Sequence, residues 1–130
     1  MQYFSGHVIF RGKFNYASLS PHIRKIIELF LELSGQKAMV QREGRLDLLV
    51  YMNRRDLMKG RKPEGVNREN AKMRLLFPLH RKEIALISDV PNPKVRDATN
   101  AIAEYLKSKG FNLEVRWNDL TLLRRAGKVK

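Results

Sequence analysis

Alternating apolar and polar residues near both ends of the chain predict β-strands. Between Tyr3 and Phe14, the side chains of Phe4, Val8 and Phe10 fall on one face of an extended chain. The other face carries Tyr3, His7, Arg11 and Lys13. Residues 111–117 alternate in the same way. We therefore expect a long first strand with a polar, partly basic outer face, and a last strand close to the C-terminus.

Apolar residues at helical spacing predict two helices. Ser20-Pro21 and Ser34-Gly35 are start and stop signals for a helix over residues 20–34. Its apolar stripe is Ile23, Ile26, Ile27, Phe30 and Leu31. Asn92-Pro93 and Lys109-Gly110 mark a second helix over about 93–109 in the same way. Its buried face is predicted to hold Val95, Ala98, Thr99, Ile102 and Leu106. Both stripes should pack against a sheet.

The middle of the chain predicts further strands and one long loop. Residues 37–42 and 45–52 flank Glu43-Gly44 and are predicted to form a hairpin with the glycine in the turn. Residues 53–70 show no sustained period, so we expect a loop with at most one helical turn at its start. Strands are then expected over 71–77 and 84–89, with Met73, Leu75 and Phe77 facing inward.

The predicted fold class is α+β, a mostly antiparallel sheet of five to six strands with two helices on one face. The element order is β-α-β-β-(basic loop)-β-β-α-β, followed by a short helix through Leu123 or a tail that is basic over 124–130. With 130 residues, of which 43% are hydrophobic, residues 1–130 are expected to form a single folded domain.

Positive charge is concentrated in residues 53–82. This stretch holds ten Lys or Arg residues against three Asp or Glu, in a chain of net charge +13. The predicted nucleic-acid contacts are Arg54, Arg55, Lys59, Arg61, Lys62, Arg68, Lys72, Arg74, Arg81 and Lys82. Lysine and arginine that neutralise phosphates release condensed counterions, which drives binding to polyanions. The charge pattern therefore favours a nucleic-acid partner over a membrane, for which a basic amphipathic helix would be typical.

Aromatic residues beside the basic stretch favour single strands. Tyr51 precedes the predicted loop and His80 follows the next strand, and both are predicted to contact nucleic acid. Unstacked bases stack on rings of this kind, so single-stranded DNA or RNA is the expected ligand. Phe77 is expected in the core, and Trp117 in the core or a subunit interface. Apolar residues on both strand faces also predict a homo-oligomer, in the simplest case a symmetric dimer.

Catalysis is the weaker interpretation. The chain has no cysteine, its three histidines lack metal-like spacing, and no phosphate-cradling glycine motif occurs, so we expect no metal and no cofactor. One alternative is a metal-dependent nuclease built from Asp47, Asp56, Glu83 or Asp89. Another is a structural component of a nucleoprotein particle. No apolar run approaches the roughly 20 residues of a membrane span, and no signal peptide is evident, so a cytoplasmic location is expected.

Overall fold

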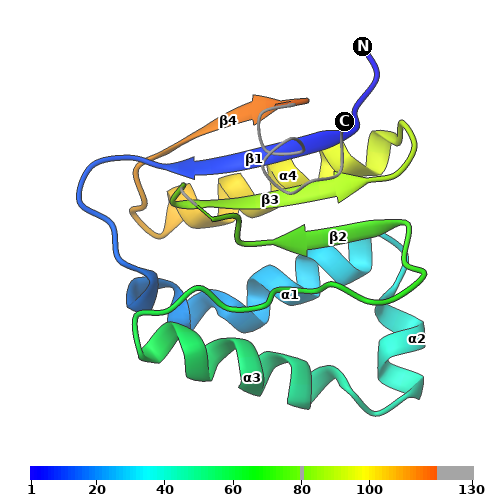
Figure 1. Ribbon diagram of the computed structural model, residues 1–130, viewed down its shortest axis with the longest axis horizontal. Coiled ribbons are helices and arrows are strands. Elements are labelled where there is room, and N and C mark those ends of the chain that lie inside the picture. Colours follow the sequence, from blue (N-terminus) through cyan, green and yellow to red (C-terminus); the bar gives the residue numbers. More distant parts are fainter. Residues whose placement is uncertain (80, 120–130) are drawn as a thin grey trace.

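The centre of the molecule is a four-stranded antiparallel sheet with the order β2-β3-β1-β4 (Figure 1). The computed structural model of the protein describes residues 1–79 and 81–119. The strands are β1 (Ser5–Phe10), β2 (Met73–Leu76), β3 (Glu83–Ser88) and β4 (Leu113–Trp117). Helical crossovers join β1 to β2 and β3 to β4, which gives the β-α-β-β-α-β order of the ferredoxin-like, split βαβ arrangement. The predicted α+β class is confirmed, but the predicted five to six strands are too many.

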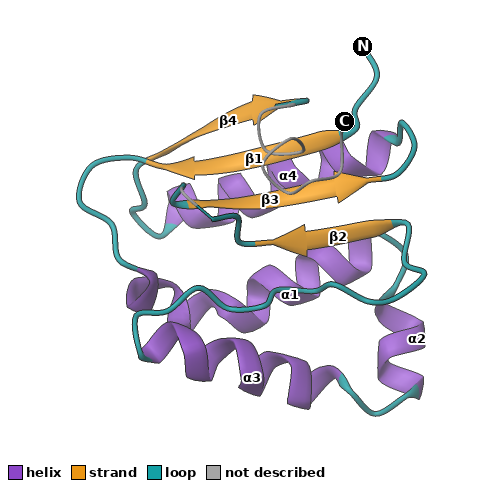
Figure 2. Cartoon of the chain, in the orientation of Figure 1, coloured by secondary structure: helices purple, strands orange, loops and turns teal. Residues whose placement is uncertain are grey.

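Two helices, α1 (Ile23–Leu33) and α4 (Pro93–Ser108), cover one face of the sheet (Figure 2). The five apolar residues predicted for the first stripe are all fully buried, as are the five residues predicted for the second. Asn92 caps α4 by accepting a hydrogen bond from the Lys94 backbone N–H at 2.9 Å. A side chain at Gly6 would place its Cβ 2.1 Å from Thr99 Oγ1, so this glycine allows α4 to pack close to β1.

The first helical region begins earlier than predicted. Ser20-Pro21 lies inside a 3₁₀ helix, η1 (Tyr16–His22), which leads directly into α1. The capping residue is Asn15, whose side chain accepts a hydrogen bond from the Ser18 backbone N–H at 3.2 Å. A polar residue and a proline therefore did mark helical structure, but the chain had already entered it four residues before Ser20.

The hairpin predicted over 37–52 is wrong. These residues form α2 (Lys37–Arg42) and the first half of α3 (Leu46–Met58), and Gly44, with φ of 67°, connects two helices instead of two strands. The segment contains few β-branched residues and many strong helix formers, so intrinsic propensity favours helix. The burial of Val50, Asn53 and Leu57 follows the helical spacing i, i+3, i+7. Leu46, Leu48 and Val50 alternate as in a strand, whereas Leu46, Leu49 and Val50 have helical spacing, so the segment carries both patterns.

The extra helix α3 changes the predicted loop. It packs against η1 and α1 on the side away from the sheet (Figure 1). Its last turns include residues 53–58, so the loop proper is shorter than predicted and runs from 59 to 72. The loop is fixed to the sheet at one point by an isolated β-bridge between Val66 and Leu75.

The second face of β1 is not the exposed polar surface that alternation predicts. Ser5, His7 and Ile9 are at most 6% exposed. The predicted short helix through Leu123 and the basic tail over 124–130 lie outside the described residues, except for Asn118 and Asp119. Within 1–79 and 81–119, no helix combines the length and the apolar character that crossing a membrane requires.

Candidate nucleic-acid interface

Three segments that are distant in sequence meet at one end of the molecule. Lys62 Nζ donates a hydrogen bond to the Pro78 carbonyl at 2.7 Å, and Lys82 Nζ donates one to the Phe14 carbonyl at 3.2 Å. Arg54 Nε donates to the Ser20 carbonyl at 3.2 Å. These bonds bring together the end of α3, the chain after β1 and the β2–β3 connection, at the left of Figure 1.

We call this region the cationic end. It comprises Lys13, Arg54, Arg55, Lys59, Arg61, Lys62 and Lys82. Arg54 and Lys62 are half-buried, and the other five side chains are exposed. Within the described part of the chain, no Asp or Glu side chain lies within ion-pair distance of any of the seven. The region therefore holds concentrated positive charge that is free to meet an anionic ligand.

The remaining predicted cations lie elsewhere or are paired with acids. Arg68 Nη2 lies 3.0 Å from Glu43 Oε1, and Arg74 Nη1 lies 3.2 Å from Asp89 Oδ1. Both arginines, with the exposed Lys72, are near the start of β2, at the opposite end of the sheet from the cationic end (Figure 1). The structure thus divides the predicted stretch. It brings together Arg54, Arg55, Lys59, Arg61, Lys62 and Lys82, adds Lys13, and separates Arg68, Lys72 and Arg74 from them.

Arg81 lies near the cationic end but is held by two carboxylates. It forms ion pairs with Glu83 and with Asp119, the latter at 2.6 Å. Partial burial lowers the pKa of Arg81, but the hydrogen bond to Asp119 and the charge of Glu83 outweigh this effect and raise it overall. This guanidinium serves the interior of the fold and is less available to a ligand than its neighbours.

Tyr51 supplies an exposed aromatic ring. Its side chain is 61% exposed on α3, one turn before Arg54 and Arg55. Tyr16 is buried, and its burial raises the pKa of its hydroxyl to about 12, so Tyr16 stays neutral and packs edge-on against Phe14 and Phe77. Phe77 is buried as predicted. The predicted contact His80 lies outside the described residues.

Ser5, His7 and Glu83 form a hydrogen-bonded chain. Ser5 Oγ lies 2.8 Å from His7 Nε2, and His7 Nδ1 lies 2.7 Å from Glu83 Oε2. This order of hydroxyl, imidazole and carboxylate is the one that activates a nucleophilic serine. However, all three side chains are at most 1% exposed, and Asn118 Oδ1 already accepts the backbone N–H of Ser5. The arrangement is therefore that of a polar network packed in the interior.

The carboxylates of the nuclease alternative do not converge. Asp47 pairs with Arg24 at 2.7 Å, Asp89 pairs with Arg74, and Glu83 belongs to the network just described. Asp56 lies on α3, apart from the others. Over residues 1–79 and 81–119, no group of three or more potential metal ligands is found.

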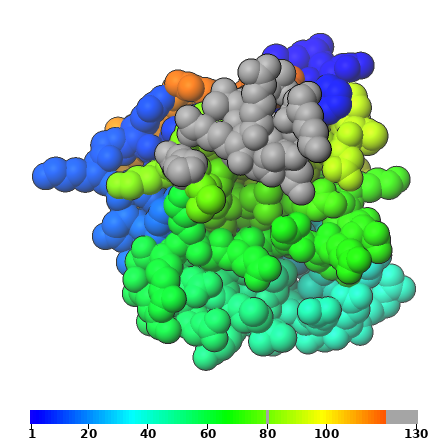
Figure 3. Space-filling model, viewed as in Figure 1, coloured from blue at the N-terminus to red at the C-terminus, as the bar shows by residue number. Residues whose placement is uncertain are grey.

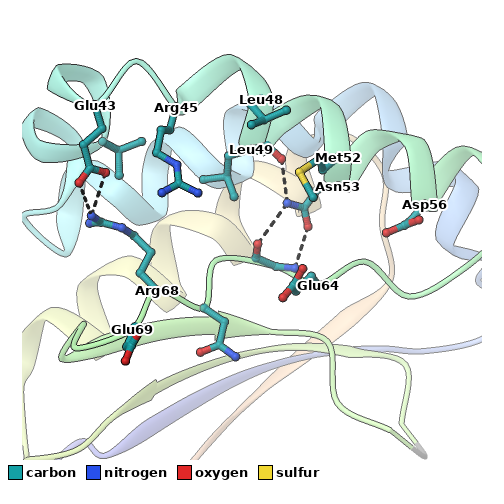
Figure 4. Close-up of a pocket in the computed structure, with 13 residues that line it drawn as sticks. Glu43, Arg45, Leu48, Leu49, Met52, Asn53, Asp56, Glu64, Arg68 and Glu69 are labelled. Atoms are coloured by element: carbon teal, nitrogen blue, oxygen red, sulfur yellow. Dashed lines mark hydrogen bonds and ion pairs between the residues drawn. The ribbon is translucent and has the colours of Figure 1, made fainter.

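A pocket of about 370 Å³ lies between α3 and the loop that follows it, and is bordered by α2 (Figure 4). Asn53 fixes the loop across its base. The side chain donates hydrogen bonds to the Leu49 and Gly65 carbonyls and accepts one from the Gly65 backbone N–H at 2.7 Å. A buried amide that pairs with both backbone groups of one loop residue holds that loop in place. In Figure 3, α2, α3 and this loop form one continuous part of the surface, coloured cyan to green.

Comparisons with known proteins give no family for this chain. No protein-family model matches the sequence, no curated protein is similar to it, and no solved structure matches the fold. The class of protein is therefore defined by the topology alone, an α+β domain of split βαβ order. Because one topology supports many functions, the function must be argued from the site.

Proposed function

We propose that this protein binds nucleic acid, with single-stranded DNA or RNA as the preferred ligand, through the cationic end. The observation that carries the proposal is the meeting of unpaired Lys and Arg side chains from three separate chain segments. Acids neutralise other arginines of the molecule, such as Arg24, Arg68 and Arg74, but not these. If the cationic end contacted only solvent, there would be no reason for acids to neutralise other arginines and leave these side chains without ion pairs.

Binding would begin with electrostatic capture. Exposed cations such as Arg55, Lys59 and Arg61 neutralise phosphates and release counterions, and this contribution does not depend on base sequence. The backbone carbonyls that accept from Arg54 and Lys62 hold these two side chains in place at the same end. Pre-positioned donors lose less conformational entropy when they meet a phosphate.

Tyr51 supports the preference for single strands. Unpaired bases expose their faces, and stacking on an aromatic ring contributes about 1–3 kcal/mol per base. Tyr51 stands one helical turn from the cations of α3, so one strand can contact both. In a duplex the bases are already stacked on each other, and this contribution is lost.

A structural role in a nucleoprotein particle and a homo-oligomer remain proposals, whereas the nuclease does not. The nuclease alternative receives no support, because its four carboxylates lie apart. The homo-oligomer is kept as a proposal, since other apolar side chains remain exposed, among them Met58 at 66% and Leu79 at 70%. A second copy would place two cationic ends in one particle and increase the affinity for a long strand through multivalency.

The proposal is tested by fluorescence anisotropy with labelled 20-nucleotide strands and duplexes of DNA and RNA, each at several salt concentrations. We expect the single strands to bind more tightly and log Kd to rise linearly with log salt concentration. The variant R55A/K59A/R61A removes three exposed charges of the cationic end. Its slope for single strands should fall by about 2, at roughly 0.7 per phosphate contact.

The matched control is R42A/K72A/K94A. It also removes three exposed cations, but these lie on or beside α2, β2 and the start of α4, at the other end of the molecule. Its slope should change by much less. Equal slopes for the two triple variants would overturn the proposal, because net charge alone would then explain the binding.

A further inference from the structure

The pocket beside α3 has an apolar wall and an acidic rim. Leu48, Leu49 and Met52 of α3 and Val40 of α2 supply the wall. The rim carries the carboxylates Glu43, Asp56, Glu64 and Glu69 against the guanidiniums of Arg45 and Arg68 (Figure 4). Positive charge dominates the chain as a whole, so an acidic surface here is a local departure from the rest of the molecule.

Most of this acidic charge is not neutralised within the described residues. Arg68 pairs with Glu43, which removes one charge of each sign from the rim. No ion pair forms at Asp56, Glu64 or Glu69 within 1–79 and 81–119, and Arg45 is the one remaining guanidinium of the lining. Glu64 and Glu69 are exposed. The rim therefore attracts cations, although the molecule as a whole repels them.

The apolar side chains extend beyond the pocket. Leu48 is 52% exposed and Met52 is 39% exposed. Met39 of α2 is 46% exposed and touches Arg68 at the rim. Flexible Met side chains adapt their shape to different apolar partners. Half-exposed apolar side chains around a pocket are typical of a surface that binds an extended partner and not only a small molecule.

We propose that this pocket binds a basic peptide segment of a protein partner. A large apolar side chain of the segment packs against Leu48, Leu49 and Met52. Its flanking Lys or Arg side chains pair with Asp56, Glu64 and Glu69. Charge complementarity selects this partner, since the same carboxylates repel phosphates and acidic peptides.

The pocket adjoins the cationic end but is lined by none of its seven residues, and peptide binding there does not depend on the proposed nucleic-acid binding. Arg45, Leu48, Leu49, Met52 and Asp56 face the pocket on one side of α3. On a helix of 3.6 residues per turn, Arg55 follows Leu48 on nearly the same stripe and Tyr51 lies about 60° from it, so the two surfaces are neighbours along α3. A protein with both surfaces would bring a basic protein segment and a nucleic acid together on one small domain.

The probe is a fluorescein-labelled synthetic peptide with two adjacent leucines flanked on each side by three arginines. Saturable binding to the full chain is expected in anisotropy titrations at low salt, despite the repulsion between peptide and protein. A second peptide with serines in place of the leucines should bind at least about fivefold more weakly, because the apolar contact is lost. A third, with glutamates in place of the arginines, should bind only through the cationic end, so its affinity should not change in the variant L48S.

Two variants locate the site. E64Q/E69Q removes exposed rim charge without altering the buried core, and should weaken binding of the first peptide at least about fivefold. The control E32Q/E104Q removes the same number of exposed carboxylates from α1 and α4, outside the pocket, and should leave binding within about twofold. L48S should weaken the leucine peptide but not the serine peptide.

Three results would overturn the proposal. The first is no saturable binding by the unaltered protein. The second is equal affinity for the leucine and serine peptides, which would reduce the effect to attraction between charges. The third is a dimer in sedimentation that L48S dissociates, because a second copy would then occupy this surface.

Discussion

The imidazole of His7 and the carboxylate of Glu83 lie 2.7 Å apart, between Nδ1 and Oε2, and both side chains are completely buried. They belong to β1 and β3, the two central strands, and a second contact from Ser5 holds the other ring nitrogen at 2.8 Å. The pair therefore connects the two central strands through side chains, in addition to the hydrogen bonds of the backbone.

The first prediction concerns this pair. E83A removes the carboxylate that His7 and Arg81 share, which leaves His7 with Ser5 and Arg81 with Asp119, and should lower the free energy of unfolding by about 3–5 kcal/mol. Urea unfolding followed by circular dichroism measures the change. In H7A/E83A the combined loss should be smaller than the sum of the two single losses, because the lost interaction is shared. A loss below about 1 kcal/mol in E83A would contradict this account of the network.

The second prediction compares two glycines of one loop. Gly65 has φ of 81°, and a Cβ there would lie 2.2 Å from the Leu75 carbonyl oxygen. Gly60 has φ of 73°, but a Cβ there meets nothing within 4 Å. G60A should cost about 1 kcal/mol for the backbone conformation alone. G65A should cost about 2 kcal/mol more, because the chain must also move away from β2. Similar unfolding midpoints for the two variants would show that the loop adjusts freely.

The third prediction separates stacking from charge at Tyr51. Y51A should weaken binding of single strands by about 1–3 kcal/mol and leave the salt slope unchanged, because no cation is removed. Y51F keeps the ring and should bind like the unaltered protein. The anisotropy titrations described above measure both quantities. If Y51A binds as tightly as Y51F, bases do not stack on this ring.

The fourth prediction concerns pH and His22. Burial, together with the nearby charge of Lys109, lowers the pKa of His22 below its usual 6.5. The unfolded chain then binds the proton more readily than the folded chain, so protonation destabilises the fold as pH falls below about 6.5. The destabilisation is complete below the folded-state pKa and absent above the unfolded-state value.

Thermal unfolding between about pH 7.5 and pH 5 tests the role of His22. The melting temperature of H22Q should fall less on acidification than that of the unaltered protein. Y105F removes the hydroxyl that lies 2.9 Å from His22 Nδ1 but keeps the titrating ring, so its pH dependence should remain. An unchanged pH profile in H22Q would assign the dependence to other groups.

A local sequence pattern predicted the secondary structure correctly where it fitted either a helix or a strand but not both. The stripe of Ile23, Ile27 and Phe30 is apolar at helical spacing and is not explained by strand alternation, and Asn92-Pro93 carries its own capping chemistry. The strands over 73–76 and 83–88 are short, mainly apolar runs, each followed within three residues by a proline, Pro78 or Pro91. These elements, and hence the α+β class, follow from the sequence.

Tertiary structure decided α3, where strand alternation and helix propensity compete in the sequence, and it alone decided the composition of the cationic end. Leu46, Leu48 and Val50 alternate as in a strand, and the helix is settled by Val50 and Leu57 packing against η1 and α1. The charge pattern located a basic stretch between 53 and 82, but it did not show that the fold divides this stretch into two surfaces. Lys62 and Arg74 lie at opposite ends of the sheet, because the chain between them runs from one end to the other. Lys13 joins Lys82 through the antiparallel pairing of β1 with β3, a relation between distant residues that no local pattern contains.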